Sequence, residues 1–362
     1  MAARLGVCTV KILHVLKHCN LSNGHVHVVV DLACAQSSKG HDVVVASGGG
    51  PYISLLEGHK IKHVMIPQSV RGAPRAVFDF HSLLKTENPT VVHAHMMGSA
   101  AIAYIPTRLR KIPLVTTMHN SFDNHSFLMR LGDVVVAVSE AERKLLLARG
   151  YSADKLRMVY NGPVDSVRKY LNPTNSVVIP AKSIISVCGL HRRKRVNLII
   201  EAFARLANNY DDWYLVIVGE GPDKQELIAL SKSLGLETRV IFQGHHPNPQ
   251  QLLQQAAIFV NFPDAEPFGL AVAEARASGC AIVVADIGGM PEVVDYGRAG
   301  TVLSEVDPES IARSLDGLMA HPNRLTELRR SAQTDLDRFT AVRMATNYDA
   351  VYTEALSRVA RR

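Results

Sequence analysis

The chain has 362 residues, of which 47% are hydrophobic and 20% are charged, and its formal net charge is +7. This composition excludes an intrinsically disordered chain, and the length favours two globular domains over one. No run of about 18 apolar residues occurs, so we expect no membrane-spanning helix.

The five cysteines form no C-x-x-C pair and no even-numbered framework. We therefore expect a reducing compartment, with the cysteines serving as small core residues. The first apolar run, residues 7–15, is too short for a signal peptide and is interrupted by Lys11. These features predict a cytoplasmic protein.

The positive charge lies in the first half. Residues 1–168 hold 19 Lys and Arg against 11 Asp and Glu, a balance of +8, whereas residues 169–362 hold 21 against 22, a balance of −1. A basic half favours an anionic partner, such as a phospholipid surface, a nucleic acid or an acidic substrate, although general solubility explains it too. Nucleic acid is disfavoured, because the basic half has no interleaved aromatic pattern and no nucleic-acid motif.

Short apolar segments alternate with helical patterns through the first half, which predicts a parallel sheet covered by helices. We expect strands at residues 10–16, 42–46, 63–66, 90–93, 114–119, 133–139 and 155–160. Helices are expected at residues 26–37, 78–84, 99–109 and 140–148, with a further helix that ends at residue 57.

A polar, proline-bearing segment, residues 165–182, reads as a domain linker, and a second alternating pattern follows it. Strands are expected at residues 184–187, 214–218, 240–243, 258–261 and 280–285. Helices are expected at residues 196–206, 223–234 and 250–256, and near residues 267–278, 308–318, 325–339 and 346–362. Pro267 suits the first turn of its helix, and Asp307 suits the N-cap before Pro308. The fold class is therefore α/β.

Ligands of parallel sheets bind at the carboxyl ends of the strands, and the first half places polar residues there. Gly24 follows the first strand, His95 follows the fourth and His119 follows the fifth. Gly24 is either a close-approach glycine beside a phosphate or an ordinary turn glycine. A single histidine at a strand end is more often structural, and we read His95 in that way. The other histidines of this half have no metal-ligand spacing.

A basic cluster, residues 192–195, follows the first strand of the second half and opens a helix. It is either a solvated charge run or a site for a phosphate, which Arg193 can grip with two hydrogen bonds and Lys194 as a point charge. No metal site is expected. The only D-x-D sequence, residues 335–337, reads as surface charge on a helix, and the adjacent His245 and His246 point to different sides.

The most informative segment is residues 262–292, FPDAEPFGLAVAEARASGCAIVVADIGGMPE. Glu266 precedes an expected helix, and Glu274 lies about two turns later. The backbone N–H groups of Phe268, Gly269 and Leu270 would open that helix and form an anion site. Two carboxylates beside an anion site suit a nucleotide sugar, which has a diol, a pyrophosphate and a polyol. The alternative is an amphipathic helix with one capping acid and one surface acid.

This segment resembles the signature of retaining glycosyltransferases of family 4, in which two glutamates are separated by seven residues. The resembling positions are Glu266, Phe268-Gly269-Leu270, Glu274-Ala275, Ala277, Gly279, Val283-Val284-Ala285, Gly288-Gly289 and Glu292. The resemblance implies the GT-B fold, in which two Rossmann-like domains with parallel sheets face each other across a cleft. Residues 1–168 with 347–362 would form the acceptor-binding domain, and residues 169–346 the domain that binds the nucleotide sugar.

The resemblance also implies roles for single residues. Glu274 would accept the ribose hydroxyls, Glu266 would accept hydroxyls of the donor sugar, and His119 would face that sugar. Gly24 would lie near the phosphate, with Asn23 where the family has a second glycine. The phosphate arginine of the family is replaced by Gly189, so we expect Arg193 to supply that charge beside Lys194.

The expected reaction is transfer of a sugar from a UDP- or GDP-sugar to a glycan or lipid-linked acceptor, as in the synthesis of surface polysaccharide or lipopolysaccharide, without a metal or other cofactor. The basic half would then dock peripherally on the anionic inner face of the cytoplasmic membrane. Two alternatives remain open at this point. One is a GT-B sugar-nucleotide epimerase, and the other is a non-catalytic protein that binds a nucleotide sugar.

Overall fold

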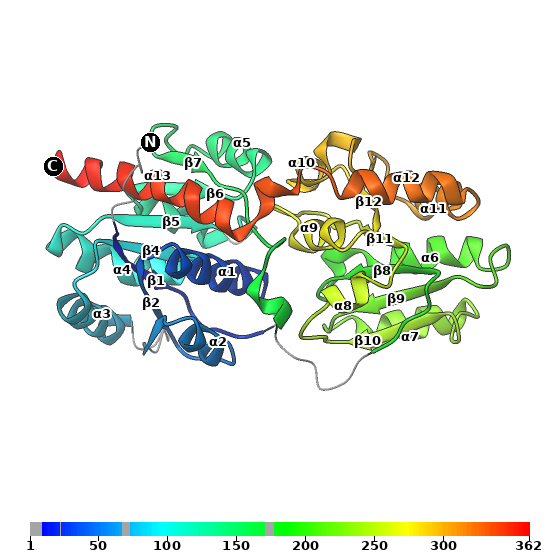
Figure 1. Cartoon of the computed structure of the whole chain (residues 1–362), viewed down its shortest axis with the longest axis horizontal. Helices are drawn as coiled ribbons and strands as arrows, with labels where there is room; N and C mark the ends of the chain where they lie inside the picture. Colours follow the sequence, from blue (N-terminus) through cyan, green and yellow to red (C-terminus); the bar gives the residue numbers. More distant parts are fainter. Residues whose placement is uncertain (1–8, 22, 67–72, 123, 171–176) are drawn as a thin grey trace, which may run out of the picture. The chain divides into compact units, whose positions relative to one another are not determined.

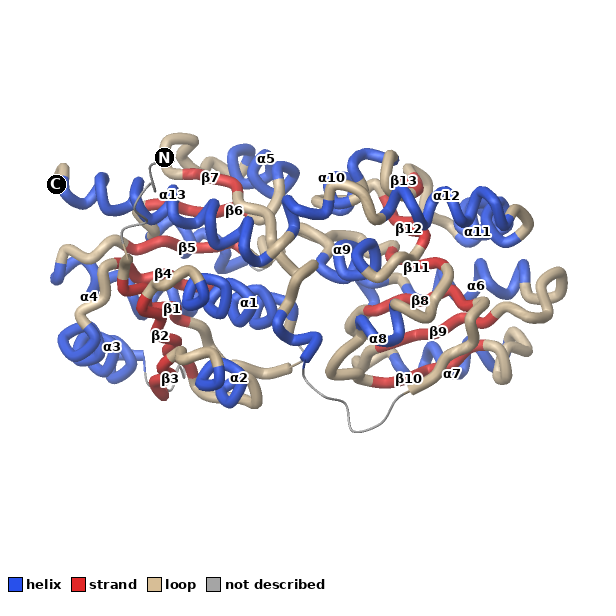
Figure 2. The backbone as a smooth tube through the Cα atoms, in the orientation of Figure 1, coloured by secondary structure: helices blue, strands red, loops and turns tan. Residues whose placement is uncertain are grey.

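The computed structural model describes residues 9–362 except 22, 67–72, 123 and 171–176. The chain divides into two compact units. The first unit consists of Met1–Ser166 and Arg338–Arg362, and the second of Val167–Asp337. Each unit contains one parallel sheet with helices packed around it (Figure 1; Figure 2).

The first sheet has seven strands in the order β3-β2-β1-β4-β5-β6-β7, and all of its strand pairs are parallel. Its strands are β1 (Lys11–Val15), β2 (Asp42–Ser47), β3 (Lys62–Met65), β4 (Val91–His95), β5 (Leu114–Met118), β6 (Val134–Ala137) and β7 (Leu156–Met158). The helices of this unit are α1 (Gly24–Ser38), α2 (Ile53–Gly58), α3 (Ala73–Glu87), α4 (Met97–Arg110), α5 (Glu140–Ala148), α13 (Ala341–Ala360) and the 3-10 helix η2 (Asn124–Leu131).

The second sheet has six parallel strands in the order β10-β9-β8-β11-β12-β13. Its strands are β8 (Ser183–Val187), β9 (Tyr214–Val218), β10 (Val240–Gly244), β11 (Ile258–Asn261), β12 (Ala281–Ala285) and β13 (Thr301–Leu303). Its α-helices are α6 (Val196–Leu206), α7 (Lys224–Ser233), α8 (Gln250–Leu253), α9 (Leu270–Ala277), α10 (Met290–Val293), α11 (Pro308–Met319) and α12 (Pro322–Ala332). Short 3-10 helices are η3 (Val167–Tyr170), η4 (Arg192–Lys194), η5 (Asp295–Gly297) and η6 (Leu336–Phe339).

The predicted α/β class and the parallel sheets are confirmed, and most strands are the buried apolar runs that the sequence indicated. The short strand β13 is only half-buried and was not predicted. The strand order reverses once in each sheet, between β1 and β4 and between β8 and β11. At such a reversal the loops leave in opposite directions and open a crevice at the carboxyl ends of the strands. The loops that follow β1, β4, β8 and β11 are therefore the natural places for ligands.

Two local expectations were wrong. The helix expected at residues 325–339 ends at Ala332, and Asp335 has a left-handed backbone with φ of 50° before the short helix η6. The helix expected to contain Pro267 begins at Leu270, and Gly269 is its N-cap. The N-cap expected at Asp307 is confirmed, since its carboxylate accepts from the backbone N–H groups of Glu309 and Ser310.

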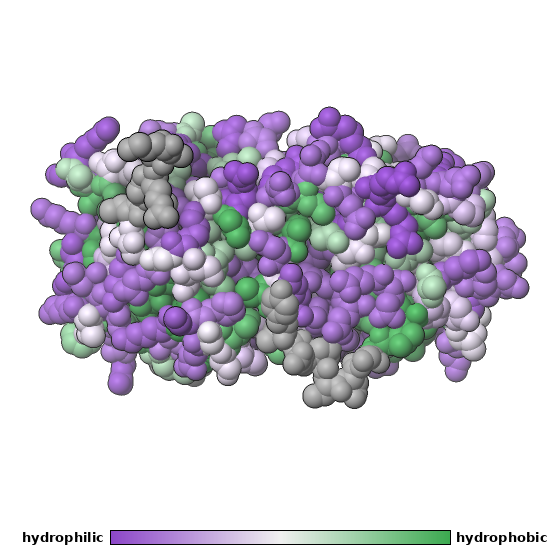
Figure 3. Space-filling model, viewed as in Figure 1, coloured by the Kyte–Doolittle hydropathy of each residue, from purple (hydrophilic) through white to green (hydrophobic). Residues whose placement is uncertain are grey.

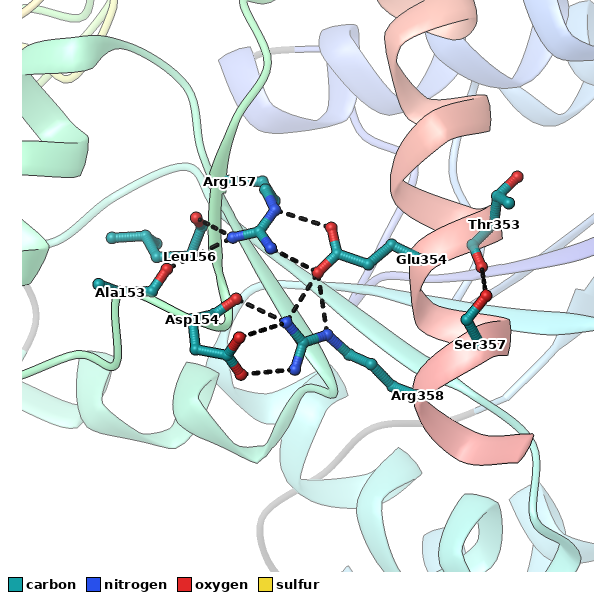
Figure 4. Close-up of polar contacts among 8 residues, drawn as sticks. All are labelled: Ala153, Asp154, Leu156, Arg157, Thr353, Glu354, Ser357 and Arg358. Atoms are coloured by element: carbon teal, nitrogen blue, oxygen red, sulfur yellow. Dashed lines mark hydrogen bonds and ion pairs between the residues drawn. The ribbon is translucent and has the colours of Figure 1, made fainter. Parts of the chain in front are cut away.

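The C-terminal helix α13 belongs to the first unit, where ion pairs join it to β7 and the loop that precedes it (Figure 4). Arg157 donates to both carboxylate oxygens of Glu354, at 2.7 and 2.6 Å. Arg358 binds Asp154 at 2.7 Å and Glu354 at 2.8 Å. On the buried side of the same helix, the Tyr352 hydroxyl accepts from Gln36 Nε2 of α1 at 2.9 Å. The C-terminal segment therefore completes the fold of the first unit.

Candidate active site

In the second unit, the loops that follow β8 and β11 meet at the reversal of strand order. Lys194 Nζ lies 2.6 Å from Glu266 Oε2, and only 11% and 17% of these two side chains are exposed. Removal from water strengthens the attraction between opposite charges. A basic loop and an acidic loop, which the sequence placed 72 residues apart, therefore form one charged site.

The neighbours of Lys194 hold the two loops together. Arg195 Nε lies 3.0 Å from Asp264 and donates at 2.8 Å to the carbonyl of Phe262. Arg193 remains exposed, and its Nη1 donates at 3.3 Å to the carbonyl of Ala265. The basic cluster is thus divided. Lys194 and Arg195 stabilise the loop, whereas the guanidinium of Arg193 stays accessible to solvent beside it.

A third loop, residues 286–289, supports Glu266 through the backbone. The N–H of Gly289 donates to the Glu266 carbonyl at 3.0 Å. Gly288 has a positive φ of 56°, and a Cβ on Gly288 would lie 1.9 Å from that same carbonyl oxygen. Only glycine fits this approach, because any side chain would collide with the backbone of Glu266.

The beginning of α9 contains the other residues that the resemblance implied for binding the nucleotide-sugar donor. Gly269 adopts φ of 101°, Phe268 is buried, and Leu270 is the first helical residue. The first turn of a helix leaves its N–H groups without intrahelical partners, so this end favours anions. Arg276 fixes the helix further along, by donating to the carbonyls of Ala332, Val293 and Thr334.

Glu274 lies in α9 and is 5% exposed. Its Oε1 accepts a hydrogen bond from Arg168 Nη2 at 2.8 Å, and Arg168 is equally buried. Arg168 was not predicted as a site residue. It lies in the segment that was expected to be a linker, and it is 106 positions from Glu274 in the sequence. A carboxylate has four acceptor positions, so the pair leaves capacity for hydroxyl groups.

In the first unit, Gly24 begins α1 and His119 follows β5. The ring of His25, the neighbour of Gly24, lies 6.1 Å from the ring of His119. The two loops that carry these predicted residues therefore meet in this unit. Burial lowers the pKa of His119 to about 3 and that of His25 to about 4, so both rings are neutral at pH 7.

The histidines of this unit are more connected than the sequence suggested. His95 Nδ1 lies 3.0 Å from His119 Nε2, and His95 Nε2 lies 3.0 Å from His14 Nδ1. His14, His93 and His95 also have ring nitrogens within 4.8 Å of one another. His93 and His95 are local neighbours on β4, but His14 comes from β1, which is distant in the sequence and adjacent in the sheet, so local spacing could not reveal the whole cluster.

Two family models cover most of the chain. Residues 177–335 match "Glycosyl transferases group 1", and residues 22–165 match "Glycosyltransferase Family 4". The chain belongs to glycosyltransferase family 4. It is therefore a glycosyltransferase that uses a nucleotide-sugar donor. Its two units, each with one parallel sheet, have the GT-B fold.

Individual relatives are distant. The N-acetyl-alpha-D-glucosaminyl L-malate synthase of Bacillus anthracis is 26% identical over 294 residues, covering 75% of this chain and 76% of the relative. A Campylobacter jejuni enzyme, N-acetylgalactosamine-N,N'-diacetylbacillosaminyl-diphospho-undecaprenol 4-alpha-N-acetylgalactosaminyltransferase, is 30% identical over 242 residues, covering 64% and 65%.

Among solved structures, Anabaena HepE in complex with UDP and glucose has a TM-score of 0.80. It is 20% identical, and the match covers 95% of this chain and 99% of HepE. At this identity the likeness supports the shared fold alone. The substrates and ligands in the names of these proteins are properties of those proteins.

Proposed function

We propose that this glycosyltransferase moves a sugar from a UDP- or GDP-sugar to a glycan or lipid-linked acceptor in surface polysaccharide or lipopolysaccharide assembly. The observation that carries the proposal is the pairing of Lys194 with Glu266 where β8 and β11 separate. This end of the second sheet combines a basic loop, a helix N-terminus and two glutamates, Glu266 and Glu274, which is the chemistry that a nucleotide sugar requires.

Each group has a proposed task. The N–H groups of Phe268, Gly269 and Leu270 bind sugar and phosphate, while Arg193 and Lys194 stabilise the negative charge that grows on the leaving nucleoside diphosphate. Glu266 binds hydroxyls of the donor sugar, and Glu274 binds the ribose. Lys194 orients Glu266 by their short contact. In the first unit, the proposed task of His119 is to bind a sugar hydroxyl, and that of Gly24 is to lie near a phosphate.

Transfer in this family retains the anomeric configuration. The proposed mechanism has the acceptor hydroxyl attack on the face from which the nucleoside diphosphate departs. Cations at the diphosphate lower the barrier because they interact more strongly with the developing charge than with the intact donor.

The test is a binding panel of UDP, GDP, ADP and their sugars by thermal shift, followed by turnover with the donor that binds. A Glu266→Gln variant should retain nucleotide binding and lose turnover. If the donor sugar were inverted at a ring carbon instead of transferred, the epimerase alternative would replace the proposal. Binding without transfer or hydrolysis in the wild type would favour the non-catalytic alternative.

The acceptor proposal rests on the surface of α3 and α4. Phe78 is 69% exposed, and Ile105 and Leu109, one turn apart on α4, are 55% and 72% exposed. Arg75 and Lys111 lie on the same two elements or at their ends. Exposed apolar side chains beside basic ones suit an anionic lipid surface, where each basic residue contributes about 1 kcal/mol. Not every basic residue of this half is available for docking, since Arg108 binds the buried Asp133 at 2.9 Å.

The described helices include none that is long and apolar enough to cross a bilayer. The face drawn in Figure 3 is mostly hydrophilic, and its hydrophobic residues form small separate patches. The exposed apolar and basic residues of α3 and α4 lead us to propose peripheral docking on the inner face of the cytoplasmic membrane. The name of the Campylobacter relative includes an undecaprenol diphosphate, a lipid-linked acceptor, which supports the same proposal.

Sedimentation with phosphatidylglycerol vesicles tests the docking. We expect binding at low salt that weakens at high salt and is absent with phosphatidylcholine. Leu109→Ser should reduce binding, whereas Leu234→Ser, which changes an exposed leucine of the second unit, should not. No binding at low salt, or equal loss in both variants, would contradict the proposal.

A further inference from the structure

A line of hydrogen bonds leads from α1 to His119 through the sheet of the first unit. Gln36 Oε1 lies 2.7 Å from His14 Nε2, His14 Nδ1 lies 3.0 Å from His95 Nε2, and His95 Nδ1 lies 3.0 Å from His119 Nε2. Gln36, His14 and His95 are fully buried, and His119 is partly exposed. We call these four residues the histidine chain.

The rings of the histidine chain are neutral. Burial lowers the pKa of His14 to about 4 and holds that of His95 well below its usual value. A neutral imidazole carries one N–H donor and one bare nitrogen acceptor. A ring with a partner on each side must therefore donate on one side and accept on the other, so the whole chain has a single direction.

Gln36 sets that direction. Its Nε2 donates to the Tyr352 hydroxyl at 2.9 Å, which turns Oε1 toward His14 and makes His14 Nε2 the donor. His95 Nε2 then donates to His14 Nδ1, and His119 Nε2 donates to His95 Nδ1. The proton of His119 is thus on Nε2, and its Nδ1 is bare. Nδ1 has no hydrogen-bond partner among the described residues.

A second branch has the same direction. The Tyr352 hydroxyl accepts from Gln36 and can donate to His93 Nδ1 at 2.9 Å. His93 Nε2 then donates to Thr117 Oγ1 at 2.7 Å, and Thr117 can donate to the Tyr348 hydroxyl at 2.8 Å. This branch anchors the tyrosine that orients Gln36.

Three clustered histidines are also a possible metal set, yet the contacts favour hydrogen bonding. Both ring nitrogens of His14, His93 and His95 already have partners at 2.7–3.0 Å. Metal binding would require these bonds to break. The cluster is therefore a hydrogen-bonded network around neutral rings.

We propose that Gln36, His14 and His95 are positioning residues that hold His119 with its proton on Nε2 and present its bare Nδ1 to a hydroxyl group of a bound sugar. The second half rests on the proposed function of His119. The bare nitrogen would accept the hydroxyl proton in a hydrogen bond, and no proton is transferred. This arrangement selects a sugar that has a hydrogen-bond-donating hydroxyl at that position. A group that can only accept hydrogen bonds would leave Nδ1 unpaired.

The tautomer is measured by nitrogen NMR on protein labelled with 15N-histidine, with His119→Gln used to assign the His119 signals. We expect separate Nε2–H and bare Nδ1 resonances for wild-type His119. Gln36→Leu should collapse them into the averaged signals of a mixed tautomer. Gln36→Glu, which keeps an acceptor for His14, should restore the separation. A proton on Nδ1 in the wild type, or no change in Gln36→Leu, would overturn the proposal.

Thr107→Val is the matched control, because Thr107 is a buried side chain of the same unit whose hydroxyl bonds only within α4, to the carbonyls of Ala103 and Tyr104. Its His119 signals should match the wild type. If Gln36→Leu does not fold, Tyr352→Phe replaces it, since loss of the hydroxyl frees the Gln36 amide and should also mix the tautomers. Zinc bound stoichiometrically to purified wild-type protein would also overturn the proposal.

The sugar contact is tested by titrating the labelled protein with UDP-glucose, and with the best-binding nucleotide sugar of the panel if UDP-glucose does not bind. We expect the Nδ1 resonance to shift with the sugar nucleotide but not with UDP alone. Binding without such a shift would overturn the sugar contact. Failure of every nucleotide sugar to bind would overturn the proposed function and this contact together, while the tautomer is judged on its own spectra.

Discussion

Arg193 and Lys194 are adjacent, yet their surroundings differ. Lys194 is buried against Glu266, whereas Arg193 is exposed beside the Ala265 carbonyl. Replacing Lys194 would leave the carboxylate of Glu266 without its partner and disturb the loop. Replacing Arg193 leaves that ion pair in place. Arg193 is therefore the residue at which the phosphate contact can be tested with the least structural damage.

We predict that Arg193→Ala weakens UDP binding by about tenfold or more, the effect of losing one charge-assisted hydrogen bond of about 1.5–3 kcal/mol. Uridine, which lacks the diphosphate, should bind the variant and the wild type equally. Arg192→Ala is the matched control, since Arg192 is the exposed neighbour. Calorimetric titration gives the affinities. Unchanged UDP affinity in Arg193→Ala would favour the alternative interpretation, in which the basic cluster is only a solvated charge run.

Local pattern could identify Glu266, Glu274 and the basic cluster, because their motifs lie within short segments. It could not identify Arg168 as the partner of Glu274 or connect His14 to His95. Those contacts join residues that are 106 and 81 positions apart. They depend on which strands and loops become neighbours in space. The roles of the site residues remain predictions.

At the scale of elements, the loop of residues 286–289 supports the site alongside α9, because it contacts the backbone of Glu266. Its glycine was visible in the sequence, but the reason for the glycine was not, because the approach of Gly288 to the Glu266 carbonyl is a tertiary contact. Most strands were easier to predict, since they are short runs of buried apolar residues, whereas the half-buried β13 was not predicted. Element ends were harder, as at Pro267, where the left-handed Gly269 determines where α9 begins.

We predict that Gly288→Ala displaces Glu266 and abolishes most of the turnover. Its Cβ would lie 1.9 Å from a backbone oxygen, which no side-chain rotation relieves. Gly235→Ala is the control for backbone strain alone, since Gly235 also has a positive φ, of 71°, but its Cβ would meet nothing within 4 Å. The control should lose about 1–2 kcal/mol of stability and keep its activity. Equal activity of both variants, measured with the same donor, would refute this role of the loop.

At the scale of the whole molecule, the two units differ in how they should respond to acid. The first sheet contains His14, His93 and His95, and burial holds the pKa of each ring below its usual value. None of the six strands of the second sheet contains a histidine. In the unfolded chain a histidine takes up a proton near pH 6.5, whereas these buried rings stay neutral to lower pH.

We therefore predict that the first unit loses stability first as the pH falls. Below about pH 6.5 the unfolded state binds more protons than the native state, so each such histidine removes about 1.4 kcal/mol per pH unit until its folded pKa is reached. Above pH 6.5 this contribution is fully present.

Hydrogen exchange at pH 7.5 and 5.5, corrected for intrinsic rates, should show lower opening free energies at the lower pH in β1 and β4. The strands β8 and β11 are the internal control and should change much less. His119→Asn should reduce the pH slope of the first unit by the amount of one group, because burial lowers the pKa of His119 to about 3. An equal response of both sheets would show that general charge repulsion, and not the neutral buried histidines, limits the stability of the molecule in acid.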